Sequence, residues 1–112
     1  MCTRKSEMYP PYTREITKEK EALTPKEMEA WRHFSRTIFE AGALPEMTKQ
    51  IIAVAVAHDT QCPYCIKSHT KQALKKGASK QQLMEAIWIA TEMRAGSVTA
   101  HAAIAIDTMD KT

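Results

Sequence analysis

Apolar residues recur three and four positions apart through most of this chain, and no segment alternates apolar with polar residues over several positions. The first spacing places side chains on one face of a helix, whereas alternation is typical of a half-buried strand. The sequence therefore predicts an all-α fold, a bundle of about five helices. A chain of 112 residues is long enough for one hydrophobic core, so we expect a single domain.

Capping residues, prolines and glycines mark where the predicted helices begin and end. Thr24 and Ser79 each open a capping box, in which a hydroxyl residue is followed three positions later by Glu or Gln. Each of the three glycines follows a helical stretch, and glycine commonly ends a helix. The predicted helices run from Thr24 to Gly42, from Pro45 to about residue 57, from Cys62 to Gly77, from Ser79 to Gly96 and from Ser97 to Ile106.

The beginning of the chain lacks the apolar period of the rest. Residues 1–22 hold two prolines and two tyrosines among charged residues, which favours an extended segment. We therefore predict an N-terminal arm over residues 1–22 and a helical domain over residues 23–112.

Charge and hydropathy exclude several classes of partner. Sixteen Lys and Arg stand against thirteen Asp and Glu, and the two signs alternate without a basic block, so no nucleic-acid partner is expected. The longest strongly apolar run, residues 51–57, is far too short to cross a bilayer. The charged N-terminus lacks the apolar stretch of a signal peptide. We expect a cytoplasmic protein with no membrane partner.

The chain has three cysteines, and two of them, Cys62 and Cys65, lie three positions apart. An odd number without an export signal argues against a structural disulfide framework and favours reactive thiols or metal ligands. Cys2 stands apart near the terminus with no neighbour that would lower its pKa, so we expect it to be inert.

The cysteine pair stands at the predicted start of a helix. A thiolate in the first turn is stabilised by unpaired backbone N–H groups and by the helix dipole, and Cys62 occupies that place. Cys65 and His69 follow at spacings of three and four, so all three lie on one helical face. The imidazole can take a proton from the thiol or, once protonated, hold the thiolate by charge.

Two thiols at this spacing also close readily into a disulfide. A sulfenic acid formed on one of them can be captured by the other before it is oxidised further. The pattern of Cys62, Cys65 and His69 therefore predicts a thiol redox site that needs neither a metal nor an organic cofactor.

The same residues allow a different interpretation, a zinc-binding or regulatory module. Two Cys and one His are common ligands of tetrahedral zinc, and the fourth would have to come from His58 or His101. We rank this hypothesis below the redox site, because structural zinc modules tend to be loop-rich and this chain has enough apolar residues to fold unaided.

One part of the chain is similar to a known family. The stretch Lys49 to Ala55, then His58, the segment Cys62 to His69, and Gly77 to Ser79 resemble the core of the carboxymuconolactone decarboxylase and alkylhydroperoxidase D-like family. The resemblance covers roughly residues 25–106, and its most specific part is CxxCxxxH, which marks the peroxidase-like branch. A decarboxylase-like enzyme of the same fold is a third hypothesis, but the decarboxylase-like branch generally lacks the cysteine pair, so the pair retained here speaks against it.

The resemblance implies an all-helical fold, assembly into trimers or hexamers, and reduction of a hydroperoxide substrate by a dithiol, either lipoyl or thioredoxin-like. It assigns the attack on the peroxide to the second cysteine, which maps to Cys65, with Cys62 as the resolving thiol and His69 moving the proton. Helix position alone instead favours the lower pKa for Cys62, so the order of the two roles stays open.

Position 50 departs from the family pattern. The family usually has a proton-relay glutamate after a lysine on the preceding helix, and here Gln50 follows Lys49. An amide cannot accept a proton, so two alternatives stay open: His58, four residues before Cys62, replaces it as a base, or the activity is weak or of another kind. Tyr64, between the cysteines, is expected to shield them.

Two of the predicted helices carry more apolar surface than a monomer of this size can easily bury. They are the second, around residues 45–57, and the alanine-rich fifth, residues 97–106. We therefore expect a homo-oligomer.

Overall fold

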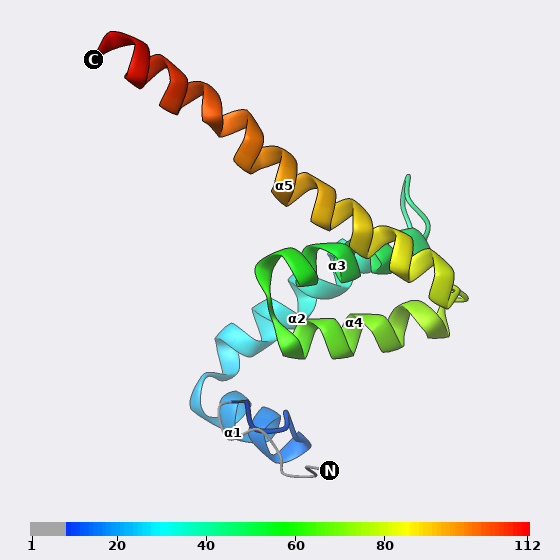
Figure 1. Cartoon of the computed structure of the whole chain (residues 1–112). Coiled ribbons are helices and arrows are strands. Elements are labelled where there is room, and N and C mark those ends of the chain that lie inside the picture. Colours follow the sequence, from blue (N-terminus) through cyan, green and yellow to red (C-terminus); the bar gives the residue numbers. More distant parts are fainter. Residues whose placement is uncertain (1–8) are drawn as a thin grey trace, which may run out of the picture. The chain divides into compact units, whose positions relative to one another are not determined.

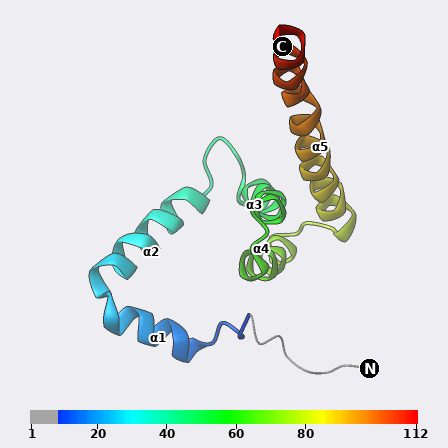
Figure 2. The same cartoon turned by 60° about the vertical axis from the view of Figure 1, so that its left-hand side comes forward.

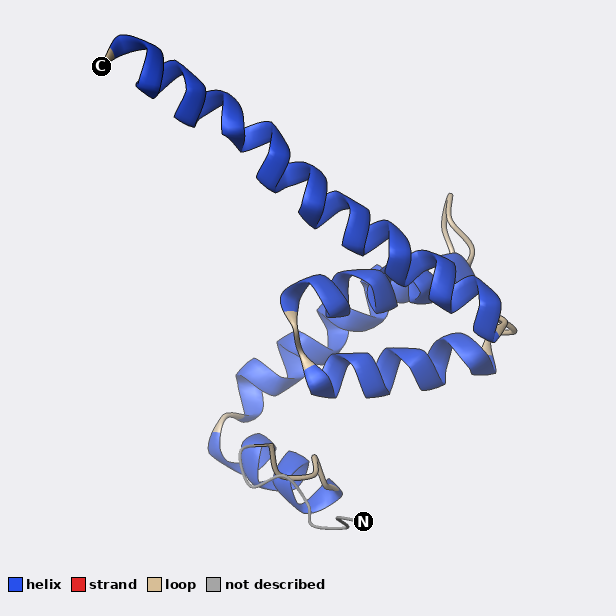
Figure 3. Cartoon of the chain, viewed as in Figure 1, coloured by secondary structure: helices blue, strands red, loops and turns tan. Residues whose placement is uncertain are grey.

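The computed structural model describes residues 9–112, and its regular structure in that range is entirely helical (Figure 3). The helices are α1 (Arg14–Leu23), α2 (Pro25–Phe39), α3 (Glu46–Thr60), α4 (Pro63–Lys75) and α5 (Lys80–Lys111). The predicted all-α class is confirmed. None of these helices is long and apolar enough to span a membrane. The chain divides into two compact units, of which one ends at Glu46 and the other begins at Met47 (Figure 1).

The first unit contains a helix that the sequence analysis misses. The prediction of an extended arm is wrong for residues 14–22, which belong to α1. Thr13 caps this helix, since its side chain accepts a hydrogen bond of 3.2 Å from the backbone N–H of Ile16. The charged residues that suggest an arm are mostly Glu and Lys, which have high helix propensity. The proposed boundary between arm and domain remains a prediction.

Helices α1 and α2 meet at a bend around Thr24 (Figure 2). The predicted capping box at Thr24 is wrong, because its hydroxyl donates to the backbone carbonyl of Lys20 in α1, at 2.8 Å, and α2 begins without a side-chain cap. Arg32 in α2 and Glu21 in α1 form a bidentate ion pair, with N–O distances of 2.6 and 2.9 Å. Helix α2 ends at Phe39, three residues before the predicted Gly42.

The second unit is built around the packing of α3 against α4, which lie side by side in Figures 1 and 2. Its small core contains Val54, Ala73, Ala78 and Leu83, and Met47, Ile51 and Ile87 pack against it. The prediction that α3 is buried all round is only partly right. Gln50, Val54 and Ala57 are buried, whereas Ile52 and Val56 are 46% and 52% exposed in the described chain.

The turn between α3 and α4 sets the place of the first cysteine. Gln61 adopts a left-handed backbone, φ 57°, which reverses the chain after α3. The backbone N–H of Cys62 then donates to the carbonyl of Ala57 at 3.1 Å, so Cys62 is fixed to the end of α3 just before α4 begins. At the other end of α4, Gly77 has φ 102°, a conformation that favours glycine, and the predicted stop there is confirmed.

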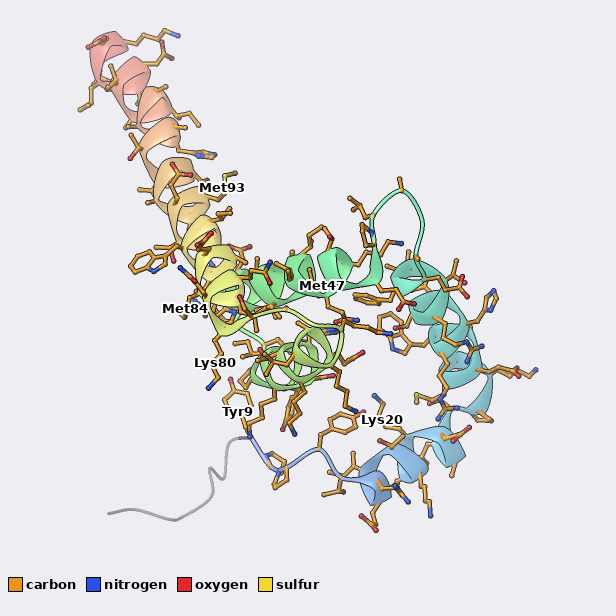
Figure 4. All side chains as sticks on the ribbon, turned by 90° about the vertical axis from the view of Figure 1, so that its right-hand side faces the viewer. Tyr9, Lys20, Met47, Lys80, Met84 and Met93 are labelled. Carbon is orange, nitrogen blue, oxygen red and sulfur yellow. The ribbon has the colours of Figure 1, made fainter. Side chains whose placement is uncertain are left out.

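Helix α5 is one continuous helix from Lys80 to Lys111, so the predicted break at Gly96 is wrong. A glycine inside a helix costs about 1 kcal/mol relative to alanine but removes no hydrogen-bond donor, so its neighbours can carry the helix through. The predicted capping box at the start of α5 is confirmed, because Ser79 and Gln82 exchange side-chain and backbone hydrogen bonds. The side chains of Met84 and Met93, labelled in Figure 4, are both at least half exposed.

Candidate active site

The two thiols stand at the first turn of α4. Cys62 is the N-cap residue in an extended conformation, and Pro63 takes the first helical position, where proline is favoured. The sulfur of Cys62 accepts a hydrogen bond of 3.2 Å from the backbone N–H of Cys65. Both cysteines are free thiols and partly buried. A cysteine thus occupies the position that Ser, Thr or Asp usually takes at a helix start.

This arrangement shifts the pKa values of the two thiols in opposite directions. The pKa of Cys62 is lowered, first by a hydrogen bond from the side chain of Cys65 and then by backbone N–H groups, that of Cys65 and more weakly that of Tyr64. The pKa of Cys65 is raised, first by its hydrogen bond to the Cys62 sulfur and then by burial. Cys62 therefore ionises more readily than Cys65, and Cys65 holds its proton more firmly.

His69 lies one turn after Cys65 on the same helix and is partly buried. Its Nδ1 is 2.8 Å from Oε1 of Gln50 on α3. Burial lowers the pKa of His69, because the imidazolium is less well solvated than the neutral ring. At neutral pH the ring is therefore uncharged and able to accept a proton.

Gln50 is the buried polar residue of this region, with 4% of its surface exposed. Its Nε2 donates to Oε1 of Gln72 at 3.4 Å, and Nε2 of Gln72 donates to the hydroxyl of Ser68 at 3.0 Å. The four side chains form a chain of hydrogen bonds from His69 to the surface of α4. The sequence prediction did not include Gln72 and Ser68, although Gln72 lies three positions after His69 and four after Ser68, which are helical spacings that could have pointed to both.

Two further histidines, His58 and His101, have partners on their own helices. Nδ1 of His58 donates to the backbone carbonyl of Val54 at 2.8 Å, and Nδ1 of His101 donates to that of Ser97 at 2.7 Å. These bonds anchor both rings to the helix backbone, and a relay role for His58 remains a prediction. Cys2 lies outside the described residues, so its expected inertness also remains a prediction.

Two further features bear on the chemistry. A groove of about 560 Å³ runs between α3 and α5, lined by Ala55, Val56, Asp59, Ile89, Ala90, Met93, Arg94, Ser97 and Val98. Its lining includes neither cysteine nor His69. Among residues 9–112, no group of three or more His, Cys, Asp or Glu is arranged to hold a metal ion. Zinc analysis of the purified protein is the direct test of the zinc interpretation.

The fold and the site define a small helical protein with a CxxC pair at a helix start and a histidine one turn later. Residues 25–108 match the model of the carboxymuconolactone decarboxylase family, and the chain belongs to that family. It is 53% identical over 83 residues to uncharacterized protein 4 in the cox locus of Paracoccus denitrificans, covering 74% of this chain and 75% of that one.

Solved structures agree with this assignment. A crystal structure of a protein from Methanobacterium thermoautotrophicum is 30% identical and superposes with a TM-score of 0.71, covering 74% of this chain and 93% of that one. A carboxymuconolactone decarboxylase family protein from Legionella pneumophila, solved in its apo form, is 29% identical with a TM-score of 0.67, covering 88% of this chain and 91% of the other.

Proposed function

We propose that this protein is a thiol-dependent hydroperoxide reductase in which Cys62 and Cys65 cycle between dithiol and disulfide. The observation that supports it most is the hydrogen-bonded thiol pair at the N-terminus of α4, in which the pKa of one thiol is lowered and that of the other is raised. His69, one turn on, supplies a neutral base beside the protonated thiol. Such a site needs a reducing compartment such as the cytoplasm, where thiols are kept reduced.

In the first step, His69 accepts the proton of Cys65, and the Cys65 thiolate attacks the outer oxygen of the hydroperoxide. The O–O bond breaks, Cys65 becomes a sulfenic acid, and the alkoxide leaves as the alcohol with the proton from His69. The raised pKa of Cys65 explains why this step requires a base. The thiol is oxidised by two electrons and the peroxide is reduced by two.

In the second step, the Cys62 thiolate attacks the sulfur of the sulfenic acid. An S–S bond forms, the S–O bond breaks, and the leaving hydroxide takes a proton from solvent and departs as water. The lowered pKa of Cys62 suits this resolving role, because it raises the fraction of this thiol that is ionised and nucleophilic. A dithiol partner, lipoyl or thioredoxin-like, then reduces the disulfide by thiol exchange and becomes a disulfide itself.

A coupled assay tests the proposal. Cumene hydroperoxide is mixed with catalytic amounts of protein and excess dihydrolipoamide, and the loss of peroxide is followed over time. We expect many turnovers per chain, at a rate that vanishes without the dithiol. A rate no higher than that of the Cys62→Ser/Cys65→Ser double variant would refute the peroxidase assignment.

We also propose that the chain assembles with copies of itself. The described part of α5 leaves Trp88, Ile89, Met93, Val98, Ile104 and Met109 more than 60% exposed, and the groove between α3 and α5 is lined mainly by apolar side chains. Exposed apolar surface of this extent usually marks an interface.

Light scattering at micromolar concentration should therefore give a mass several times the 12.6 kDa of one chain. The resemblance to the family favours three or six copies. Ile104→Asp should lower that mass, because a charge would be buried without a partner, while circular dichroism should show that the helix content is kept. A wild-type mass of one chain would contradict the assembly.

A further inference from the structure

Gln50 is the least exposed polar residue of the described chain, and it contacts the histidine of the site directly. We infer that Gln50 is a positioning residue that holds His69 in the tautomer protonated at Nδ1, so that Nε2 is the nitrogen that accepts the proton of Cys65. The consequence for turnover depends on the proposed peroxidase function. The tautomer itself does not, and it can be measured without any peroxide.

The direction of the hydrogen bonds carries this inference. Oε1 of Gln50 can only accept, so the 2.8 Å contact requires a proton on Nδ1 of His69. The orientation of the Gln50 amide is set in turn by its Nε2, which donates to Oε1 of Gln72. Nε2 of Gln72 donates onward to the hydroxyl of Ser68, so every bond in the chain points away from His69. Reversing the His69 bond would require both amides to flip together.

The position of Gln50 makes this contact hard to replace by solvent. Gln50 is 4% exposed in the packing of α3 against α4, and its side chain is hydrogen-bonded to the amide of Gln72 and the ring of His69. A ring that is fixed at Nδ1 presents Nε2 at a constant angle. A fixed tautomer is a known requirement for a histidine base, since a ring protonated at the wrong nitrogen cannot accept the proton.

An amide holds the His69 tautomer without carrying a charge. A carboxylate at 2.8 Å from Nδ1 would also hold the tautomer, but it would favour the imidazolium by its charge. The carbonyl of Gln50 supplies the hydrogen bond alone, so the lowering of the pKa of His69 by burial is not opposed by an anion at position 50. The glutamine thus keeps His69 an uncharged base, where the glutamate expected from the family pattern would form an ion pair with the protonated ring.

The test uses nitrogen NMR of the full-length, reduced, ¹⁵N-labelled protein at slightly alkaline pH, where His69 is neutral. In the wild type we expect His69 to show a protonated Nδ1 and an unprotonated Nε2. Gln50→Leu removes the acceptor while keeping an apolar fit, and the ring should then shift toward the Nε2-protonated form that free histidine prefers in water. Gln50→Glu should restore the Nδ1-protonated form and raise the pKa of His69 measured by titration of the same signals.

Controls separate positioning from folding. Gln81→Leu removes an exposed glutamine from the first turn of α5 and should leave the His69 signals unchanged. If Gln50→Leu does not fold, the wild type and Gln50→Glu still decide the matter. An Nε2-protonated His69 in the wild type, or a pKa that Gln50→Glu fails to raise, would overturn the inference. If the tautomer is as expected but no peroxide is consumed, the proposed function fails and the positioning role of Gln50 stands.

Discussion

Replacing Cys65 with serine should reduce dithiol-dependent hydroperoxide turnover by on the order of a thousandfold or more, to the background rate. The proposed cycle has no other thiol next to His69 that could form the sulfenic acid, and a serine hydroxyl is not oxidised by peroxide. The measurement is the initial rate of cumene hydroperoxide loss with dihydrolipoamide. A Cys65→Ser variant that keeps more than a tenth of the wild-type rate would contradict the assignment of the attack to Cys65.

The matched variant Cys62→Ser distinguishes attack from resolution. In the absence of added thiol, it should consume one equivalent of peroxide and keep a sulfenic acid on Cys65, because Cys62 can no longer capture it. Dimedone labelling and peptide mass mapping should place that acid on Cys65. If the label appears instead on Cys62 in the Cys65→Ser variant, the order of the roles is reversed and helix position decides the attacking thiol. Cys2→Ser should leave turnover unchanged.

Replacing His69 with alanine or glutamine should slow peroxide turnover by about a hundredfold, the usual scale of general base catalysis. The pKa of Cys65 is raised, so at neutral pH its thiolate must be made by transfer of a proton to a neighbouring base. Alkylation of Cys65 by iodoacetamide, followed by peptide mapping at neutral pH, should slow in the same variants. Alkylation of Cys62 should change less, because the groups that lower its pKa lie at the start of α4.

The pH dependence gives a further check on His69. Its pKa is lowered by burial, so the ring stays neutral through neutral pH and gains a proton only at a lower pH than free histidine. The wild-type rate should therefore fall when the pH drops through that lowered pKa, and the His69→Ala rate should lose this dependence. Unchanged thiol reactivity in a His69 variant with native circular dichroism would mean that the helix terminus alone activates the cysteines and that the histidine is structural.

Much of the site could be predicted because it depends on local rules. Cys62 precedes a proline and Cys65 and His69 follow at helical spacing, so the start of α4 and the shared face can be read along a single segment. The same local rules gave wrong helix boundaries where two signals in one segment disagreed. Thr13 was a strong cap for α1 in a segment without a clear apolar period, and the single Gly96 was too weak a break to stop α5.

What could not be predicted depends on contacts between helices. The bond between Gln50 and His69 joins residues nineteen positions apart, and it exists only because α3 packs against α4. The resemblance marks position 50 as a departure from the family pattern, but neither the burial of Gln50 nor the direction of its hydrogen bonds follows from spacing. Parts of α3 and α5 are exposed in the single chain, although their apolar residues predict burial. A pattern of apolar residues indicates that a face is covered, but it does not show whether the same chain or another copy covers it.

The most direct test of the proposed redox pair is the fate of the thiols after one mild treatment with hydroperoxide. The fully reduced protein is exposed to about one equivalent of peroxide, free thiols are counted, and peptides are mapped by mass under non-reducing conditions. The account predicts a loss of two hydrogens assigned to a bond between Cys62 and Cys65, reversed by a dithiol, with Cys2 still free. Two reduced thiols after treatment, or stoichiometric zinc bound in the purified protein, would contradict it.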